Sequence, residues 1–95
     1  MTDKIWKPDP AASFERRMGM SPQDPSPGGG TPTGEHGGCP DIWEMSSGDV
    51  AVIGRDLTES YRSRLPDGVS IVGNERLVII PRSVIIAAKA DIPDA

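Results

Sequence analysis

The branched apolar residues of this 95-residue chain lie almost entirely in its second part. Of the 18 valines, isoleucines and leucines, only Ile5 precedes residue 39. Glycine and proline show the opposite distribution, since 13 of these 21 residues fall within positions 1–38. A chain folds only where buried apolar side chains offset the entropy lost on ordering. The composition therefore predicts a boundary near Cys39, with a compact domain over residues 39–95 that stays folded when residues 1–38 are deleted.

Charge and apolar runs exclude several classes of protein. Ten Lys and Arg face 14 Asp and Glu, a formal net charge of −4, which argues against nonspecific binding to nucleic acid or to an anionic membrane. No apolar run approaches the roughly 20 residues that cross a bilayer. The N-terminus has no apolar stretch behind a basic start, so it does not resemble a secretory signal. We expect a cytoplasmic protein without a membrane partner.

Residues 1–38 divide into two segments. Residues 21–38, SPQDPSPGGGTPTGEHGG, contain no large apolar side chain and are predicted to be a flexible linker. Residues 1–20 are predicted to be a short interaction segment, and the chain before residue 39 is expected to be disordered outside it. Because few of its residues can be buried within the chain itself, this segment is the expected contact with a protein partner.

A helix is predicted over residues 10–18 of this segment. Asp9 suits the N-cap, Pro10 the first helical position and Gly19 the stop. On such a helix Phe14 and Met18 share one face. With Trp6 they are the predicted partner-binding anchors of a helix that lies in a groove. Two alternatives stay open: the segment packs on its own domain, or it has no fixed structure alone.

Residues 39–95 are predicted to form an α+β domain in the order β-β-α-β-β-α, a small antiparallel sheet of about four strands with two short helices. Strands over 41–45 and 50–55 flank the loop SSGD and form a hairpin. A helix follows to Leu65. Segments 69–72 and 75–80 flank Gly73-Asn74 and predict a second hairpin. Residues 82–90 form the last helix or, alternatively, a fifth strand.

A domain of 57 residues has a small core, and such domains commonly gain stability by association. We therefore expect a homodimer. The apolar segment 77–86 offers more branched side chains than so small a fold can cover. The predicted self-association residues are Leu77, Ile79, Ile80, Ile85 and Ile86.

No motif predicts catalysis or cofactor binding. His36 and Cys39 have a spacing found in metal sites, but a structural zinc needs four N or S ligands, and the chain has one His and one Cys. Cys39 is expected to pack at the start of the first strand. No nucleophile elbow or phosphate-binding loop is present. We expect no metal, no cofactor and no enzymatic activity.

Two stretches resemble known families. Gly37-Gly38-Cys39, Glu44, Val50-Ala51-Val52 and Arg55-Asp56 resemble small acidic proteins of unknown function from high-GC filamentous bacteria, many encoded beside helix-turn-helix regulators. Unlike them, this chain has no Trp in the last helix. The resemblance implies a regulatory protein that binds a protein partner.

Residues 77–88, LVIIPRSVIIAA, and 48–52, GDVAV, resemble parts of the swapped-hairpin transcription factors and antitoxins, although here the two parts come in reverse order. This resemblance implies an alternative function as a small DNA-binding regulator. Its phosphate-binding residues would be Arg55, Arg76, Arg82 and Lys89. A further alternative is an accessory subunit or maturation factor of a larger enzyme.

Overall fold

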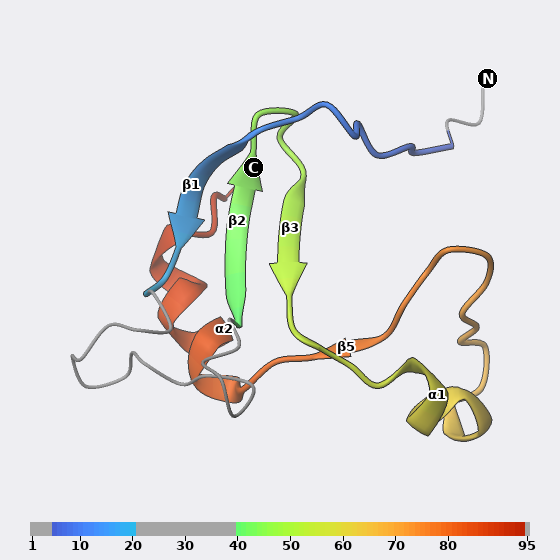
Figure 1. The fold of residues 1–95 in the computed structure, drawn as a ribbon. Helices are drawn as coiled ribbons and strands as arrows, with labels where there is room; N and C mark the ends of the chain where they lie inside the picture. The colour runs from blue at the N-terminus through green and yellow to red at the C-terminus, as the bar shows by residue number, and fades with distance from the viewer. Residues whose placement is uncertain (1–4, 21–39, 95) are drawn as a thin grey trace.

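The computed structural model describes residues 5–20 and 40–94 and has an α+β fold (Figure 1). One antiparallel sheet has the strand order β1-β2-β3, and a second pairs β4 with β5. Two short helices complete the fold, which confirms the predicted class. The elements are β1 (Phe14–Met18), β2 (Asp41–Met45), β3 (Val50–Ile53), β4 (Arg55–Asp56), α1 (Thr58–Tyr61), a 3₁₀ turn (Arg62–Arg64), β5 (Val78–Ile79), α2 (Arg82–Ala88) and a 3₁₀ turn (Lys89–Asp91).

The hairpin of β2 and β3 agrees with the sequence prediction, although its second strand ends at Ile53 and not at Arg55. Its turn depends on Gly48, whose φ of +91° lies in the region that favours glycine. The Met45 carbonyl accepts from the Gly48 amide at 2.9 Å, and the Met45 amide donates to the Asp49 carbonyl at 2.9 Å. Strand and turn signals here come from one continuous segment, so local patterns sufficed to predict the pairing.

The predicted helix over residues 10–18 is wrong. Residues Phe14–Met18 form β1, which pairs antiparallel with β2. Asp9 does act locally, because its side chain accepts from the Ala11 amide at 2.9 Å and its carbonyl from the Ala12 amide at 3.1 Å. These bonds make one turn. Beyond it, residues 14–18 form their backbone hydrogen bonds with β2 and not within a helix. The sheet therefore includes a strand from outside residues 39–95, and the predicted domain boundary does not delimit it.

An irregularity in β1 decides which side of the sheet its residues occupy. The register shifts between Phe14 and Arg16, so that Phe14 lies opposite Met45 while Met18 lies opposite Ile42. Side chains alternate along β2, and Ile42 and Met45 therefore lie on opposite faces. The bulge accordingly places Phe14 and Met18 on opposite faces as well.

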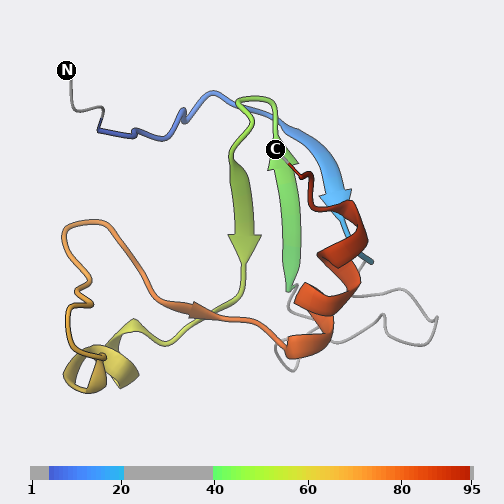
Figure 2. The ribbon, with the colours of Figure 1, turned by 180° about the vertical axis from the view of Figure 1, so that it is seen from behind.

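The core lies between this sheet and α2, which packs on the side of β1 and β2 (Figure 2). Met18 and Ile42 are each 3% exposed and Ala88 is fully buried. Ile80 and Val84 pack around these three residues. Residues 82–88 form a helix, which settles the choice left open by the sequence.

Gly19 brings the end of β1 against α2. A Cβ atom at this position would lie 3.0 Å from the Ala88 nitrogen and 3.1 Å from the Ala87 carbonyl carbon. The Gly19 amide donates to Asp91 Oδ2 at 2.8 Å, and the Arg16 guanidinium donates to the Asp91 carbonyl at 2.8 Å. The N-terminal strand and the C-terminal turn are thus fastened together.

Residues 55–79 form an arm that leaves the main sheet from the β3 side (Figure 1). The predicted hairpin of 69–72 with 75–80 is wrong: the Gly73-Asn74 turn is present, with the Glu75 amide donating to the Val72 carbonyl at 2.9 Å, but its flanks do not pair. Instead β5 pairs with β4. A turn fixes only the residues next to it, so Gly73-Asn74 does not by itself pair its flanks. The pairing of β5 with β4 depends on Gly54, because a Cβ atom at this position would lie 2.7 Å from the Ile79 carbonyl oxygen.

Candidate interaction surface

The face of the three-stranded sheet opposite α2 carries an aromatic pair, and we call Phe14, Arg17, Trp43 and Ile53 the open face. The Phe14 and Trp43 rings meet edge to face, with centroids 5.5 Å apart and planes at 79°. With Ile53 they line an apolar hollow of about 260 Å³. Phe14 remains 57% exposed and Ile53 46% exposed. The hollow is therefore open to an apolar side chain of another molecule.

An ion pair holds one side of the open face. Arg17 Nε and Nη2 donate to the two carboxylate oxygens of Asp41 at 2.9 and 3.0 Å. The Asp41 side chain is only 6% exposed, and Arg17 supplies the opposite charge beside it. The Arg17 guanidinium carbon also lies 4.7 Å from the centroid of the Trp43 ring. The two-bond geometry and this cation-π contact fix Trp43 before any partner binds.

The three predicted partner-binding anchors lie in different environments. Phe14 is on the open face. Trp6 is 66% exposed, and its Nε1 donates to Asp49 Oδ2 at 3.1 Å. Met18 is buried in the core and cannot contact a partner, because the bulge in β1 turns it toward α2. Sequence reasoning missed Trp43, although its alternation with Ile42 in a predicted strand placed it on the face opposite that core residue.

The predicted self-association residues are partly accessible. Ile79, Ile85 and Ile86 are 43%, 46% and 60% exposed. Leu77 and Ile80 are half-buried, and Ile80 packs against the core. The structure thus leaves three of these five side chains open to a second copy.

The four basic residues of the DNA-binding alternative are exposed but lie on different elements. Arg55 is in β4 and Arg76 is in the arm, where its Nη1 donates to the carbonyls of Gly73 at 3.3 Å and Glu75 at 2.6 Å. Arg82 begins α2 and Lys89 follows its last residue. Arg82 and Lys89 are therefore at opposite ends of one helix.

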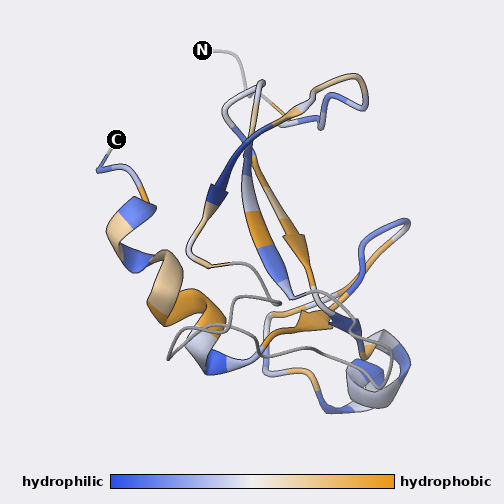
Figure 3. Cartoon of the chain, turned by 60° about the vertical axis from the view of Figure 1, so that its left-hand side comes forward, coloured by the Kyte–Doolittle hydropathy of each residue, from blue (hydrophilic) through white to orange (hydrophobic). Residues whose placement is uncertain are grey.

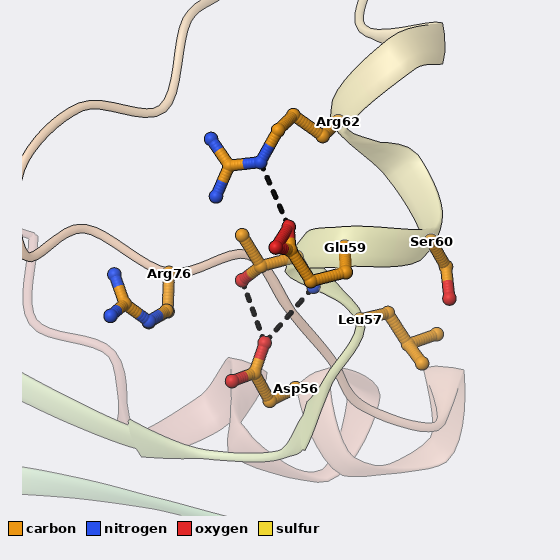
Figure 4. A pocket seen from close by; sticks show the side chains of 7 residues that line it. Asp56, Leu57, Glu59, Ser60, Arg62 and Arg76 are labelled. Carbon is orange, nitrogen blue, oxygen red and sulfur yellow. Dashed lines mark hydrogen bonds and ion pairs between the residues drawn. The ribbon is translucent and has the colours of Figure 1, made fainter.

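A polar pocket of about 210 Å³ lies at the start of α1 (Figure 4). Asp56 Oδ1 accepts from the Thr58 hydroxyl at 2.6 Å and from the Thr58 amide at 2.9 Å. The same hydroxyl accepts from the Leu77 amide at 2.8 Å. At the pocket rim, Arg62 Nε donates to Glu59 at 2.9 Å. These contacts close the first turn of α1 and tie the two sides of the arm together, a structural role that explains the polar residues.

The stability of the arm is expected to depend on pH through Asp56. The Thr58 hydroxyl, then the Thr58 amide and lastly Arg76, lower the pKa of Asp56 below its ordinary value of 3.8, while burial opposes them. The stabilisation is present above the unfolded pKa and is lost as the pH falls through the folded pKa. Asp56→Asn should therefore lose less stability than wild type when the pH falls from about 6 to about 3. Urea midpoints measure this, with Asp67→Asn in the exposed loop as the control.

Within residues 5–20 and 40–94, no group of three or more His, Cys, Asp or Glu is arranged to hold a metal ion. Over the same ranges, no helix has the length and apolar character to cross a membrane. His36, Cys39 and the predicted linker lie outside the described residues. Comparison of the chain with protein-family models, curated proteins and solved structures finds no match.

Proposed function

We propose that this chain is a non-enzymatic protein-interaction module, which binds a protein partner through the open face and also associates with itself. The observation that carries the proposal is the imbalance between exposed and buried apolar side chains. Among the described residues, 13 large hydrophobic residues are exposed, whereas the buried hydrophobic core is Met18, Ile42 and Ala88. Where such side chains gather, as Phe14 and Ile53 do beside Trp43, exposed apolar surface is typical of interaction sites.

The composition of the open face favours a protein partner. Aromatic residues and arginine are enriched in protein interfaces, where a few anchors fill apolar pockets. The hollow between Phe14, Trp43 and Ile53 offers such a pocket. The Arg17 charge beside it is already paired with Asp41, so a partner needs no compensating acid there. An apolar or aromatic anchor on the partner is the expected occupant.

DNA binding remains the second candidate function, with less support. Phosphate binding requires cations that face one backbone, whereas Arg55 and Arg76 lie in the arm and Arg82 and Lys89 lie at opposite ends of α2. Arg76 already donates to two carbonyls of its own loop. We expect no salt-sensitive binding to duplex DNA. An accessory subunit of a larger enzyme would share the interaction behaviour proposed above and differ only in its partner.

Affinity capture with variants of the full chain tests the open face. Phe14→Lys introduces a charge at the hollow, at a side chain that is more than half exposed, and should lower recovery of a specific, stoichiometric protein at least about tenfold. Val72→Lys, in the arm, makes the same chemical change at a 60% exposed site and should retain that protein. If Phe14→Lys and wild type recover the same proteins in equal amounts, the proposed site is wrong.

A further inference from the structure

The two edges of the main sheet differ in how they are protected against pairing. β1, with the sequence FERRM, carries three charged residues, whereas β3, with the sequence VAVI, carries none. Figure 3 shows the same contrast, with β1 coloured largely hydrophilic and β3 hydrophobic. Charged side chains and prolines on an edge strand discourage pairing with another chain. β3 has neither, so an extended segment of another protein can approach the sheet from this side.

The backbone of β3 presents unpaired groups to such a segment. The Asp49 carbonyl faces β2, where it accepts from the Met45 amide at 2.9 Å. Because the direction alternates along a strand, Val50 and Val52 direct their amides and carbonyls away from β2. In the described part of the chain, β3 ends the sheet order, and no strand pairs with this edge. These main-chain donors and acceptors are matched by the backbone of a further strand.

The arm leaves this edge uncovered. Its first strand, β4, pairs with β5 in a separate sheet. In Figures 1 and 2 the arm departs from the end of β3, while residues 5–12 pass beyond the turn at its start. The Val50 and Val52 side chains are 54% and 44% exposed. The open edge therefore has the length of β3, which is enough for one short added strand.

We propose that the protein partner of the open face supplies an uncharged extended segment, which pairs antiparallel with β3 as the fourth strand of the main sheet. This proposal rests on the proposed function and names the kind of partner. Addition of a strand to a free sheet edge is a recurring mode of peptide recognition, in which main-chain hydrogen bonds give affinity and side-chain pockets give specificity. Both parts are present on this side of the sheet.

The β3 edge is continuous with the open face. Ala51 and Ile53 lie opposite Trp43 and Asp41 of β2, so their side chains are on the open-face side. Ile53 borders the hollow, and Ala51 has the smallest side chain of β3. A large apolar side chain opposite Ala51 on the added strand can extend over it toward the Trp43 ring. The edge thus binds the partner's backbone, and the hollow selects one anchor side chain.

Nuclear magnetic resonance titration of the full chain tests the proposal with a defined probe. The probe is a synthetic heptapeptide that alternates threonine with valine and has phenylalanine at its centre. With phenylalanine opposite Ala51, it should bind with a dissociation constant of roughly millimolar. The amide signals of Val50 and Val52 should shift on binding, and these amides should exchange more slowly with solvent.

N-methylated forms of the peptide test which of its amides face β3. Opposite Ala51 the phenylalanine amide points away from β3, whereas the amides of its two neighbours alternate with it along the strand. N-methylation of the two neighbours should weaken binding at least about tenfold. N-methylation of the phenylalanine itself is the matched control and should change the dissociation constant less than about twofold.

Val52→Pro tests the same hydrogen bonds from the side of the protein. Proline removes an N–H that faces away from β2, so the bonds within the hairpin are kept. Binding of the peptide should weaken about fivefold. Val52→Ala retains the amide and should bind more tightly than Val52→Pro. Circular dichroism of both variants verifies that they remain folded, and the N-methylated peptides test the pairing without any substitution.

Three results would overturn this assignment: no shift of the Val50 and Val52 amides at millimolar peptide, equal binding of the two N-methylated forms, or slow exchange of these amides in the chain alone, which would indicate pairing with a second copy. The open face is measured separately through Phe14→Lys. A partner that is lost with Phe14→Lys but kept with Val52→Pro would leave the open face in place and remove the added strand.

Discussion

A chain lacking residues 1–20 is expected to lose its cooperative unfolding transition. The deletion removes β1, which exposes the edge of β2 and takes Met18 out of a core whose other buried hydrophobic residues are Ile42 and Ala88. Loss of a buried methionine side chain alone costs about 2–5 kcal/mol. Because small domains are often stable by only about 5 kcal/mol, the truncated chain should be unfolded. Thermal circular dichroism measures the transition.

Deletion of residues 1–12 is the matched control for this truncation. It removes Trp6 and the solvent-exposed hydrogen bond that Trp6 makes to Asp49. It keeps β1 and the core. This shorter deletion should melt cooperatively, with a midpoint close to that of the full chain. A sharp transition at the wild-type midpoint in the chain of residues 21–95 would show that β1 is dispensable, as the composition alone suggested.

Gly19→Ala should cause the largest loss of stability among single substitutions of the described glycines with positive φ. Two penalties add at this position. The φ of +86° costs a residue with a Cβ about 1–2 kcal/mol, and the new Cβ would press on the backbone of Ala87 and Ala88. Forcing atoms into packed regions typically costs about 1–3 kcal/mol more. We expect a total of about 3 kcal/mol, measured from urea midpoints.

Gly68→Ala separates the two penalties. Gly68 has a similar φ of +82°, but nothing lies within 4 Å of the position of its Cβ. Gly68→Ala should therefore lower the free energy of unfolding only by the penalty for a positive φ, about 1 kcal/mol. Equal losses for Gly19→Ala and Gly68→Ala would mean that the end of β1 does not pack closely on α2.

Residues 9–19 show that correct local signals can still predict the wrong type of secondary structure. Asp9 does bond to the following amides, and Gly19 does have a positive φ. Both features fit a helix, but here they begin and end a strand. The partner of that strand, β2, lies beyond more than twenty intervening residues. Pairing over such a distance leaves no periodic trace in either segment, so pattern reasoning cannot detect it.

The same reasoning explains which parts of the site were predicted. The β2–β3 hairpin and α2 follow from contiguous patterns and appear where expected, whereas the helix predicted to reach Leu65 ends at Tyr61 and is followed by a 3₁₀ turn over Arg62–Arg64. Phe14 was identified because an aromatic residue in a polar segment is conspicuous, whereas its contact with Trp43 depends on the long-range pairing. The register shift in β1, which separates Phe14 from Met18, is set by how the strand fits beside β2. No single segment encodes such a bulge.

The fastening of Gly19 and Arg16 to Asp91 has a consequence for synthesis on the ribosome. The hairpin of β2 and β3 can form as soon as its own residues emerge. Ala88, however, closes the core from the far end of α2, and Asp91 follows it. Until residues 82–91 have left the exit tunnel, Met18 and Ile42 have nothing to pack against on that side. Met18 and Ile42 therefore stay uncovered on that side until α2 has emerged, and apolar surface exposed during folding favours aggregation.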